Sequence, residues 1–289
     1  MNKFALTILF CFFIYNLFAQ KIDYIENYHK FICNAEQQTI KSNFDSALYY
    51  YNIAFNKVPY AFEFDYRNAA YIAYKAGNIN KAQQYVDSVI VRDGMIDERF
   101  KMYFPDTCIW SHLKNQKLNQ LLKIYNNKID KAACLKIDSL IAVDQGLRQF
   151  KWNSKAKLDS VIKIDSIVAE KLINLYTEGL LNEWKLSPEQ RGSVGTILCH
   201  KMIDDFSRLR TLYKFGIIDK LEYYYPSVRN ALQWNLKTTY LLPDKKANLN
   251  SPKINKVRVD DGIIPYERMR DLKKFAKKSK GMYRCPYVL

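Results

Sequence analysis

The sequence predicts an all-α protein, and three observations carry that prediction. Apolar residues recur at helical spacing along most of the chain, as in the stripe of Leu158, Val161, Ile162, Val168, Leu172 and Leu175. Only 9 Gly and 8 Pro occur among 289 residues, which favours helices joined by short connections. No segment alternates apolar and polar residues over the length of a strand, and no glycine-rich phosphate loop occurs. With 48% hydrophobic residues, the composition also excludes a disordered chain.

The N-terminus has the layout of a secretory signal peptide. A basic start, Met1-Asn2-Lys3, precedes the uncharged segment 4–18, and Ala19-Gln20 leads into a polar run. The apolar core is shorter than the roughly 20 residues that a membrane-spanning helix needs. Cys11 follows a bulky Leu9-Phe10 pair, so we do not expect a lipoprotein anchor. We therefore expect cleavage of residues 1–20 and export to the periplasm or the cell exterior.

Five cysteines remain after that cleavage, at widely spaced positions: Cys33, Cys108, Cys134, Cys199 and Cys285. An odd number leaves at least one thiol outside any intramolecular disulfide. One disulfide and buried thiols that act as small apolar residues are both compatible with the sequence.

A repeat with a period of 35 residues occupies the N-terminal region. Segment 43–47 (NFDSA) and segment 78–82 (NINKA) each open a predicted helix, and Gly77 stands at the turn before the second segment. Small residues where two helices approach, with aromatics beside them, are typical of stacked helical hairpins. This pattern resembles the tetratricopeptide repeat, although Ser42 replaces the turn glycine of the first unit.

The resemblance implies a helical repeat arm over residues 21–131, with a third, looser unit after residue 104. It also implies a groove that binds a protein or peptide partner. We expect Tyr51, Tyr74 and Tyr85 to line that groove. The alternative is that so short an array serves only as a spacer.

A second helical domain is predicted over residues 132–270. Its polar motifs follow in a fixed order: Asp144-Gln145-x-x-Arg148, Asp165-Ser166, Gly179, Val194-Gly195 with His200, Gly216, and Asn255-x-x-Arg258 before Gly262. This order resembles an uncharacterised helical family of secreted bacterial proteins that often follows tetratricopeptide-like segments. Val168 stands where that family has Asn. Because the family has no assigned activity, the resemblance implies an architecture and no reaction.

The polar residues of these motifs form the candidate site: Asp144, Gln145, Arg148, Asp165, His200 and Arg258. A His beside a carboxylate suits acid–base chemistry. The alternatives are a surface ion pair between Asp144 and Arg148, and a hydrogen-bonded core histidine. No CxxC pair occurs and the only other histidines lie in the repeat arm, so we expect neither a metal nor a cofactor.

Basic residues gather at the C-terminus. The whole chain has a net charge of +16, and residues 244–289 contain thirteen Lys or Arg against five Asp or Glu. We expect residues 271–289 to form a basic tail that is attracted to an anionic envelope surface, or a tail that is simply solvated. Export argues against nucleic acid as the partner.

The sequence therefore favours an exported protein that acts in protein–protein interaction or scaffolding. The alternative function is that of a hydrolase or small-ligand-binding domain built around His200.

Overall fold

All regular structure in the described part of the chain is helical, which confirms the predicted fold class. The computed structural model describes residues 22–94, 111–146, 148, 155–200, 207–220, 222–223, 252–279, 283 and 285. Its elements are η1 (Ile25–His29), α2 (Lys30–Ile40), α3 (Phe44–Lys57), α4 (Glu63–Lys75), α5 (Ile79–Asp93), α8 (Asn115–Lys128), α9 (Lys131–Gly146), α10 (Lys155–Thr177), η3 (Glu183–Lys185), α11 (Pro188–His200), α12 (Ser207–Lys214), α14 (Pro252–Asp260) and α15 (Tyr266–Lys278).

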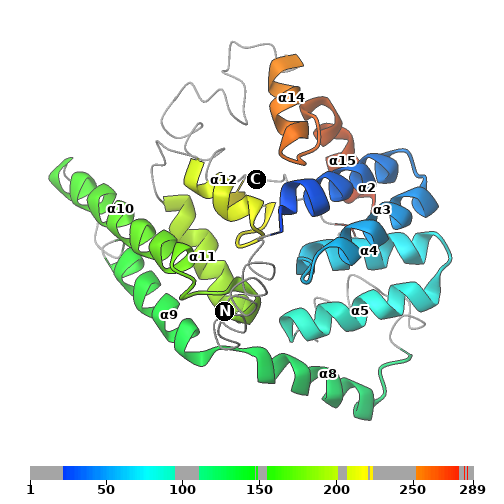
Figure 1. Ribbon diagram of the computed structural model, residues 1–289, viewed down its shortest axis with the longest axis horizontal. Coiled ribbons are helices and arrows are strands. Elements are labelled where there is room, and N and C mark those ends of the chain that lie inside the picture. The colour runs from blue at the N-terminus through cyan, green and yellow to red at the C-terminus, as the bar shows by residue number, and fades with distance from the viewer. Residues whose placement is uncertain are drawn as a thin grey trace, which may run out of the picture.

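Two helical hairpins form one side of the molecule (Figure 1). Helix α2 packs on α3, and α4 packs on α5. The two hairpins repeat with an offset of 35 residues: Ser42 turns the first with φ 59°, and Gly77 turns the second with φ 75°. Glycine adopts this left-handed backbone readily, whereas serine carries a steric cost. The period seen in the sequence therefore corresponds to two equivalent hairpins.

Helices α9, α10 and α11 pack together on the other side, and α8 lies between them and α5 (Figure 1). Helix α11 begins at Pro188, and proline is common at the first position of helices. Gly179, just after the end of α10, has a φ of 73°. Among the described helices, none combines the length and the apolar character needed to cross a bilayer.

The two sides share one hydrophobic core. The His29 ring stacks on Tyr213 at 3.9 Å, and Tyr24 stacks on Trp184 at 6.5 Å. Lys220 and Glu36 form a buried ion pair at 3.1 Å. The N-terminal hairpins are thus held to the rest of the fold by rings and charges as well as by aliphatic side chains.

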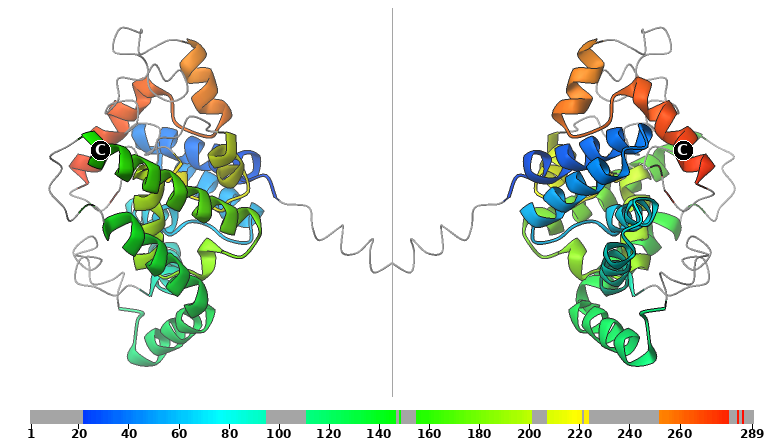
Figure 2. Two further views of the ribbon diagram at one scale, coloured as in Figure 1. Left: turned by 90° about the vertical axis from the view of Figure 1, so that its left-hand side faces the viewer. Right: turned by 90° about the vertical axis from the view of Figure 1, so that its right-hand side faces the viewer.

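The basic C-terminal segment begins as a docked helix. Helix α15 contacts α2, and Figure 2 shows it beside the hairpins. Its Phe275 ring lies 6.3 Å from Phe44 and 6.2 Å from Tyr71. The expected boundary between residues 270 and 271 falls inside this helix. The expected signal peptide, residues 1–20, lies outside the described residues.

The four described cysteines, Cys33, Cys134, Cys199 and Cys285, are all buried, and Cys108 lies outside the described residues. Their burial fits small apolar packing residues.

Candidate functional site

Helices α9, α10 and α11 bring five of the six predicted site residues together. His200 Nδ1 lies 2.7 Å from Asp144 Oδ2, which links α11 to α9. Arg148 Nη2 donates to Asp165 Oδ1 at 2.5 Å, which links the segment after α9 to α10. Gln145 Nε2 also donates to Asp144 Oδ2, at 2.6 Å. Asp144 lies in the last turn of α9, and Arg148 follows the end of that helix by two residues.

Burial shapes the electrostatics of this polar cluster. The Asp144 side chain is fully buried, and those of Asp165 and His200 are about nine-tenths buried. Burial raises the pKa of Asp165, and the neighbouring Arg148 opposes that rise. Arg148 Nε lies 3.7 Å from Asp144 Oδ2, so one guanidinium faces both carboxylates. The charges of the cluster are therefore largely balanced from within.

Three potential metal ligands meet in the cluster. One atom each from Asp144, Asp165 and His200 lies within 4.8 Å of the others. Two carboxylates and an imidazole are a common ligand set for divalent transition metals. The Arg148 guanidinium already pairs with both carboxylates, so a bound cation would have to displace it. The arrangement favours an oriented imidazole over a metal centre.

The chemistry open to this cluster is that of a His–Asp pair. A carboxylate bonded to Nδ1 orients the imidazole and fixes which ring nitrogen carries the proton, which is how a general base is positioned. Asp144 Oδ1 has no hydrogen-bond partner among the described residues. The pair is thus positioned for acid–base or binding chemistry at the edge of α11.

Arg258, the sixth predicted site residue, does not join the cluster as expected. It lies fully buried on α14, where its Nε donates to the Ile264 carbonyl at 2.9 Å and its guanidinium lies 5.9 Å from the Tyr266 ring. Helix α14 packs against α2, whereas the residues of the cluster come from α9, α10, α11 and the segment after α9. Arg258 therefore stabilises the turn between α14 and α15. The order of the motifs along the chain does not predict this structural role.

The structure also corrects the expected position of the tyrosines that were predicted to line an open groove. Tyr51 is fully buried, Tyr85 is 4% exposed, and Tyr74 is half-buried. The Tyr85 hydroxyl donates to Asn52 Oδ1 at 2.6 Å, and the Tyr51 hydroxyl lies 3.4 Å from that of Tyr283. Tyr51 and Tyr85 are core residues of the hairpins, because other parts of the chain cover them.

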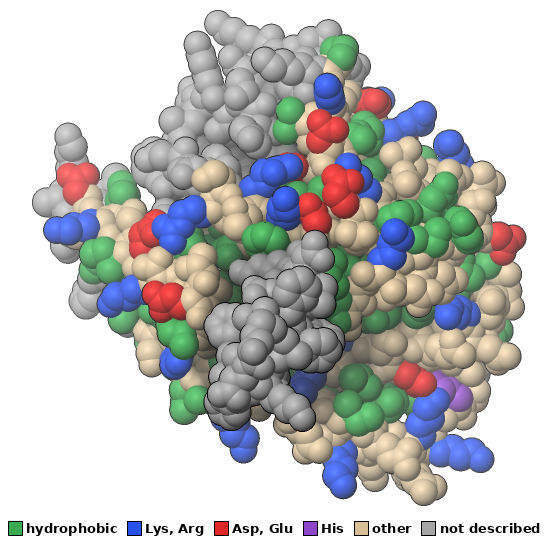
Figure 3. Space-filling view, viewed as in Figure 1, with side chains coloured by type: hydrophobic (Ala, Val, Ile, Leu, Met, Phe, Trp, Pro, Cys, Tyr) green, Lys and Arg blue, Asp and Glu red, His purple; other side chains and the backbone are tan. Residues whose placement is uncertain are grey.

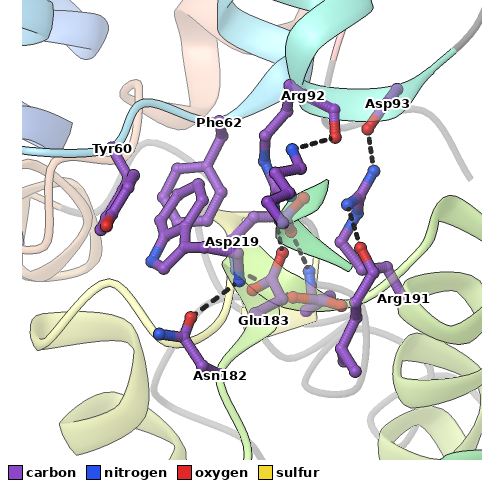
Figure 4. Close-up of polar contacts among 12 residues, drawn as sticks. Tyr60, Phe62, Arg92, Asp93, Asn182, Glu183, Arg191 and Asp219 are labelled. Atoms are coloured by element: carbon purple, nitrogen blue, oxygen red, sulfur yellow. Dashed lines mark hydrogen bonds and ion pairs between the residues drawn. The ribbon is translucent and has the colours of Figure 1, made fainter. Parts of the chain in front are cut away.

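A second buried charge network was not predicted (Figure 4). Arg92 Nη2 pairs with Glu183 Oε1 at 3.2 Å, and Arg191 pairs with Asp93. Burial raises the pKa of Glu183 far above its ordinary range, and Glu222 adds to the rise. Burial also lowers the pKa of Arg191 to about 9, and the charge of Arg92 adds to that effect. The partners are 91 residues apart in the first pair and 98 in the second, so no local pattern in the sequence predicts these pairs.

Comparisons with protein-family models, with curated proteins and with solved structures give no significant match to this chain.

Proposed function

We propose that this chain is an exported interaction protein that attaches to an anionic surface of the cell envelope through α15. The observation that carries the proposal is the two-sided character of that helix. Met269 and Leu272 are buried on one edge, while Arg268, Arg270 and Lys274 are exposed on the other. A basic edge on a helix that is already folded and docked binds anions without the cost of ordering a free tail.

The rest of the chain supports a scaffolding role for this helix. The hairpins α2–α3 and α4–α5 fit two tetratricopeptide-like units, because their turns and helix starts recur after 35 residues. Such units bind helices and peptides on one face, and here α15 itself contacts α2. The leader-like residues 1–20 support export, which would bring the protein to the envelope.

The distribution of surface charge supports α15 as the binding site for an anionic surface. On the face in Figure 3, Lys and Arg side chains are scattered among Asp and Glu, and no single field of one sign covers it. On α15, by contrast, the exposed Lys and Arg are Arg268, Arg270, Lys274, Lys277 and Lys278. The acids beside them are the exposed Glu267 and the partly exposed Asp271, which lies 3.9 Å from both Arg268 and Lys274. Each basic residue near an anionic membrane contributes about 1 kcal/mol of binding.

The test is co-sedimentation of the mature chain with vesicles. Vesicles that contain phosphatidylglycerol are compared with vesicles of phosphatidylcholine alone. The variant Lys274→Gln/Lys277→Gln/Lys278→Gln should bind the anionic vesicles roughly 100-fold more weakly, and the loss should shrink as salt is added.

The matched control removes the same charge elsewhere. Lys123→Gln/Lys131→Gln/Lys136→Gln changes three exposed lysines of α8 and α9. Equal losses in the two variants would mean that only net charge matters. Absence of binding to the anionic vesicles would overturn the proposal.

A second candidate function is that of a small-ligand-binding domain or hydrolase at the polar cluster. The 2.7 Å contact between His200 and Asp144 favours it, because it orients an imidazole at a partly exposed position. A screen of small anions and esters against the wild type and His200→Ala tests it. Binding or turnover that disappears in His200→Ala, while circular dichroism shows that the variant is folded at the assay temperature, supports this function; identical behaviour contradicts it.

A further inference from the structure

A cavity of about 330 Å³ lies between the second hairpin, α8 and η3. Its lining includes Tyr60, Tyr66 and Trp184, together with Asp87, Arg92 and Lys128. This volume falls at the lower end of the range for small-ligand sites, about 300–1,000 Å³. The polar cluster around His200 contributes no residue to this lining, so the cavity is a separate feature.

Aromatic rings form one wall of the cavity. The Tyr60 and Trp184 rings are nearly parallel, with centroids 5.3 Å apart and planes at 23°. Tyr60 is 52% exposed although its ring is large and apolar. A flat ligand that covered this ring would bury apolar surface and stack on it, which are both favourable.

Positive charge lies beside that wall. Lys128 Nζ donates to the carbonyl oxygens of Val91 and Arg92, each at 2.7 Å, at the end of α5. An ammonium group has three donors, so these two bonds leave one for a ligand. Burial, and then the charge of Arg92, lower the pKa of Lys128 to about 7. A bound anion favours the protonated amine, so the site should hold an anion best at and below pH 7.

Arg92 supplies the second indication of an anion. Its side chain is 8% exposed, and its guanidinium lies 4.5 Å from the centre of the Trp184 ring. Only Nη2 bonds to Glu183, whereas Nε and Nη1 have no acceptor within the described chain. Both nitrogens are enclosed by protein, so Arg92 offers a ligand in the cavity its positive charge and no direct hydrogen bond from these two atoms.

The acidic groups near the cavity do not cancel this charge. Asp87 is engaged by His112 Nε2 and by Lys117 Nζ, each at 2.7 Å. Burial raises the pKa of Glu183 well above its ordinary value, which favours its neutral form. Neither carboxylate therefore competes strongly with an anion at Lys128.

We propose that this cavity binds a small organic anion with a flat apolar body, of the arylcarboxylate class. Lys128 donates to the carboxylate, the charge of Arg92 attracts it, and the ring of the ligand lies against Tyr60 and Trp184. The inference is independent of the vesicle-binding proposal, because α15 contributes no residue to the cavity.

Calorimetric titration with phenylacetate and with its neutral analogue phenylacetamide tests the site. Wild type should bind phenylacetate more tightly than phenylacetamide. Lys128→Met should weaken phenylacetate binding about tenfold or more, since a hydrogen bond to a charged group is lost. Its affinity for phenylacetamide should not change. Lys123→Met is the matched control, because Lys123 is an exposed lysine of the same helix, and it should bind as wild type does.

Tyr60→Ala keeps the test decisive if Lys128→Met does not fold. Tyr60 is half-exposed, so its loss should leave the fold intact while it weakens the binding of both probes. Three results would overturn the proposal: no binding of either probe to the wild type, equal affinity of wild type for the charged and neutral probes, or unchanged phenylacetate affinity in Lys128→Met or Tyr60→Ala.

Discussion

The hydroxyl groups of Tyr51 and Tyr283 lie 3.4 Å apart, although 232 residues separate them in the chain. Both side chains are buried, and the Phe275 ring lies 5.2 Å from that of Tyr283. The C-terminal segment is therefore part of the hairpin core, and its packing contributes to the stability of the N-terminal hairpins.

Loss of an apolar side chain from α15 should destabilise the whole protein. Leu272 is fully buried, so Leu272→Ala is expected to lower the free energy of unfolding by about 2–5 kcal/mol. Urea denaturation measures the change. Lys274→Ala, on the exposed edge of the same helix, should shift it by no more than about 0.5 kcal/mol. A comparable effect of the two substitutions would show that α15 is not docked in solution.

Replacing Ser42 in the turn of the first hairpin with glycine should stabilise the protein. Ser42 has a φ of 59°, whereas Gly77 occupies the equivalent turn of the second hairpin. Ser42→Gly removes a left-handed conformation that costs a side chain about 1–2 kcal/mol, partly offset by a more flexible unfolded chain. We expect a net rise in unfolding free energy on the order of 0.5–1 kcal/mol, measured by thermal and urea unfolding. Ser42→Ala keeps the strain and should bring no gain; a gain from alanine would contradict this explanation.

The contact between His200 and Asp144 should appear as energetic coupling. In a double-mutant cycle of His200→Ala and Asp144→Ala, the coupling energy is expected to lie in the range of about 0.5–3 kcal/mol. A parallel cycle of Asp144→Ala with His112→Ala should be additive within about 0.5 kcal/mol, because His112 pairs with Asp87. Additivity in the first cycle would mean that the 2.7 Å contact does not form in solution.

The buried Asp65 should make stability depend on pH. Burial raises its pKa from 3.8 to about 7, against the opposing effects of Lys220 and of the hydrogen bond from Tyr28. The folded state then binds a proton that the unfolded state releases, so this contribution is complete below pH 4 and declines towards pH 7. Its slope is at most about 1.4 kcal/mol per pH unit.

The measurement for Asp65 is the unfolding free energy of wild type and Asp65→Asn across that pH range. The advantage of the wild type over the variant should fall as the pH rises. A constant difference would show that Asp65 keeps an ordinary pKa in the folded protein.

Features that depend on neighbours in the sequence were predictable. The helical class follows from apolar spacing, and the 35-residue period follows from the small and turn residues. Asp144 and Arg148 lie close together because only four residues separate them at the end of α9. These features are set within one or two turns of backbone, where local rules act.

Features that depend on helix packing were not predictable. The approach of Asp165 and His200 to Asp144 requires α10 and α11 to pack beside α9, and Arg258 lies apart because α14 packs on α2. Tyr51 is a buried core residue, and Tyr283 of the C-terminal segment packs against its hydroxyl group. The pair of Arg92 with Glu183, 91 residues apart, leaves no pattern in the sequence. Local spacing therefore sets each helix and the residues on its faces, whereas the burial of those faces decides which distant charges and rings meet.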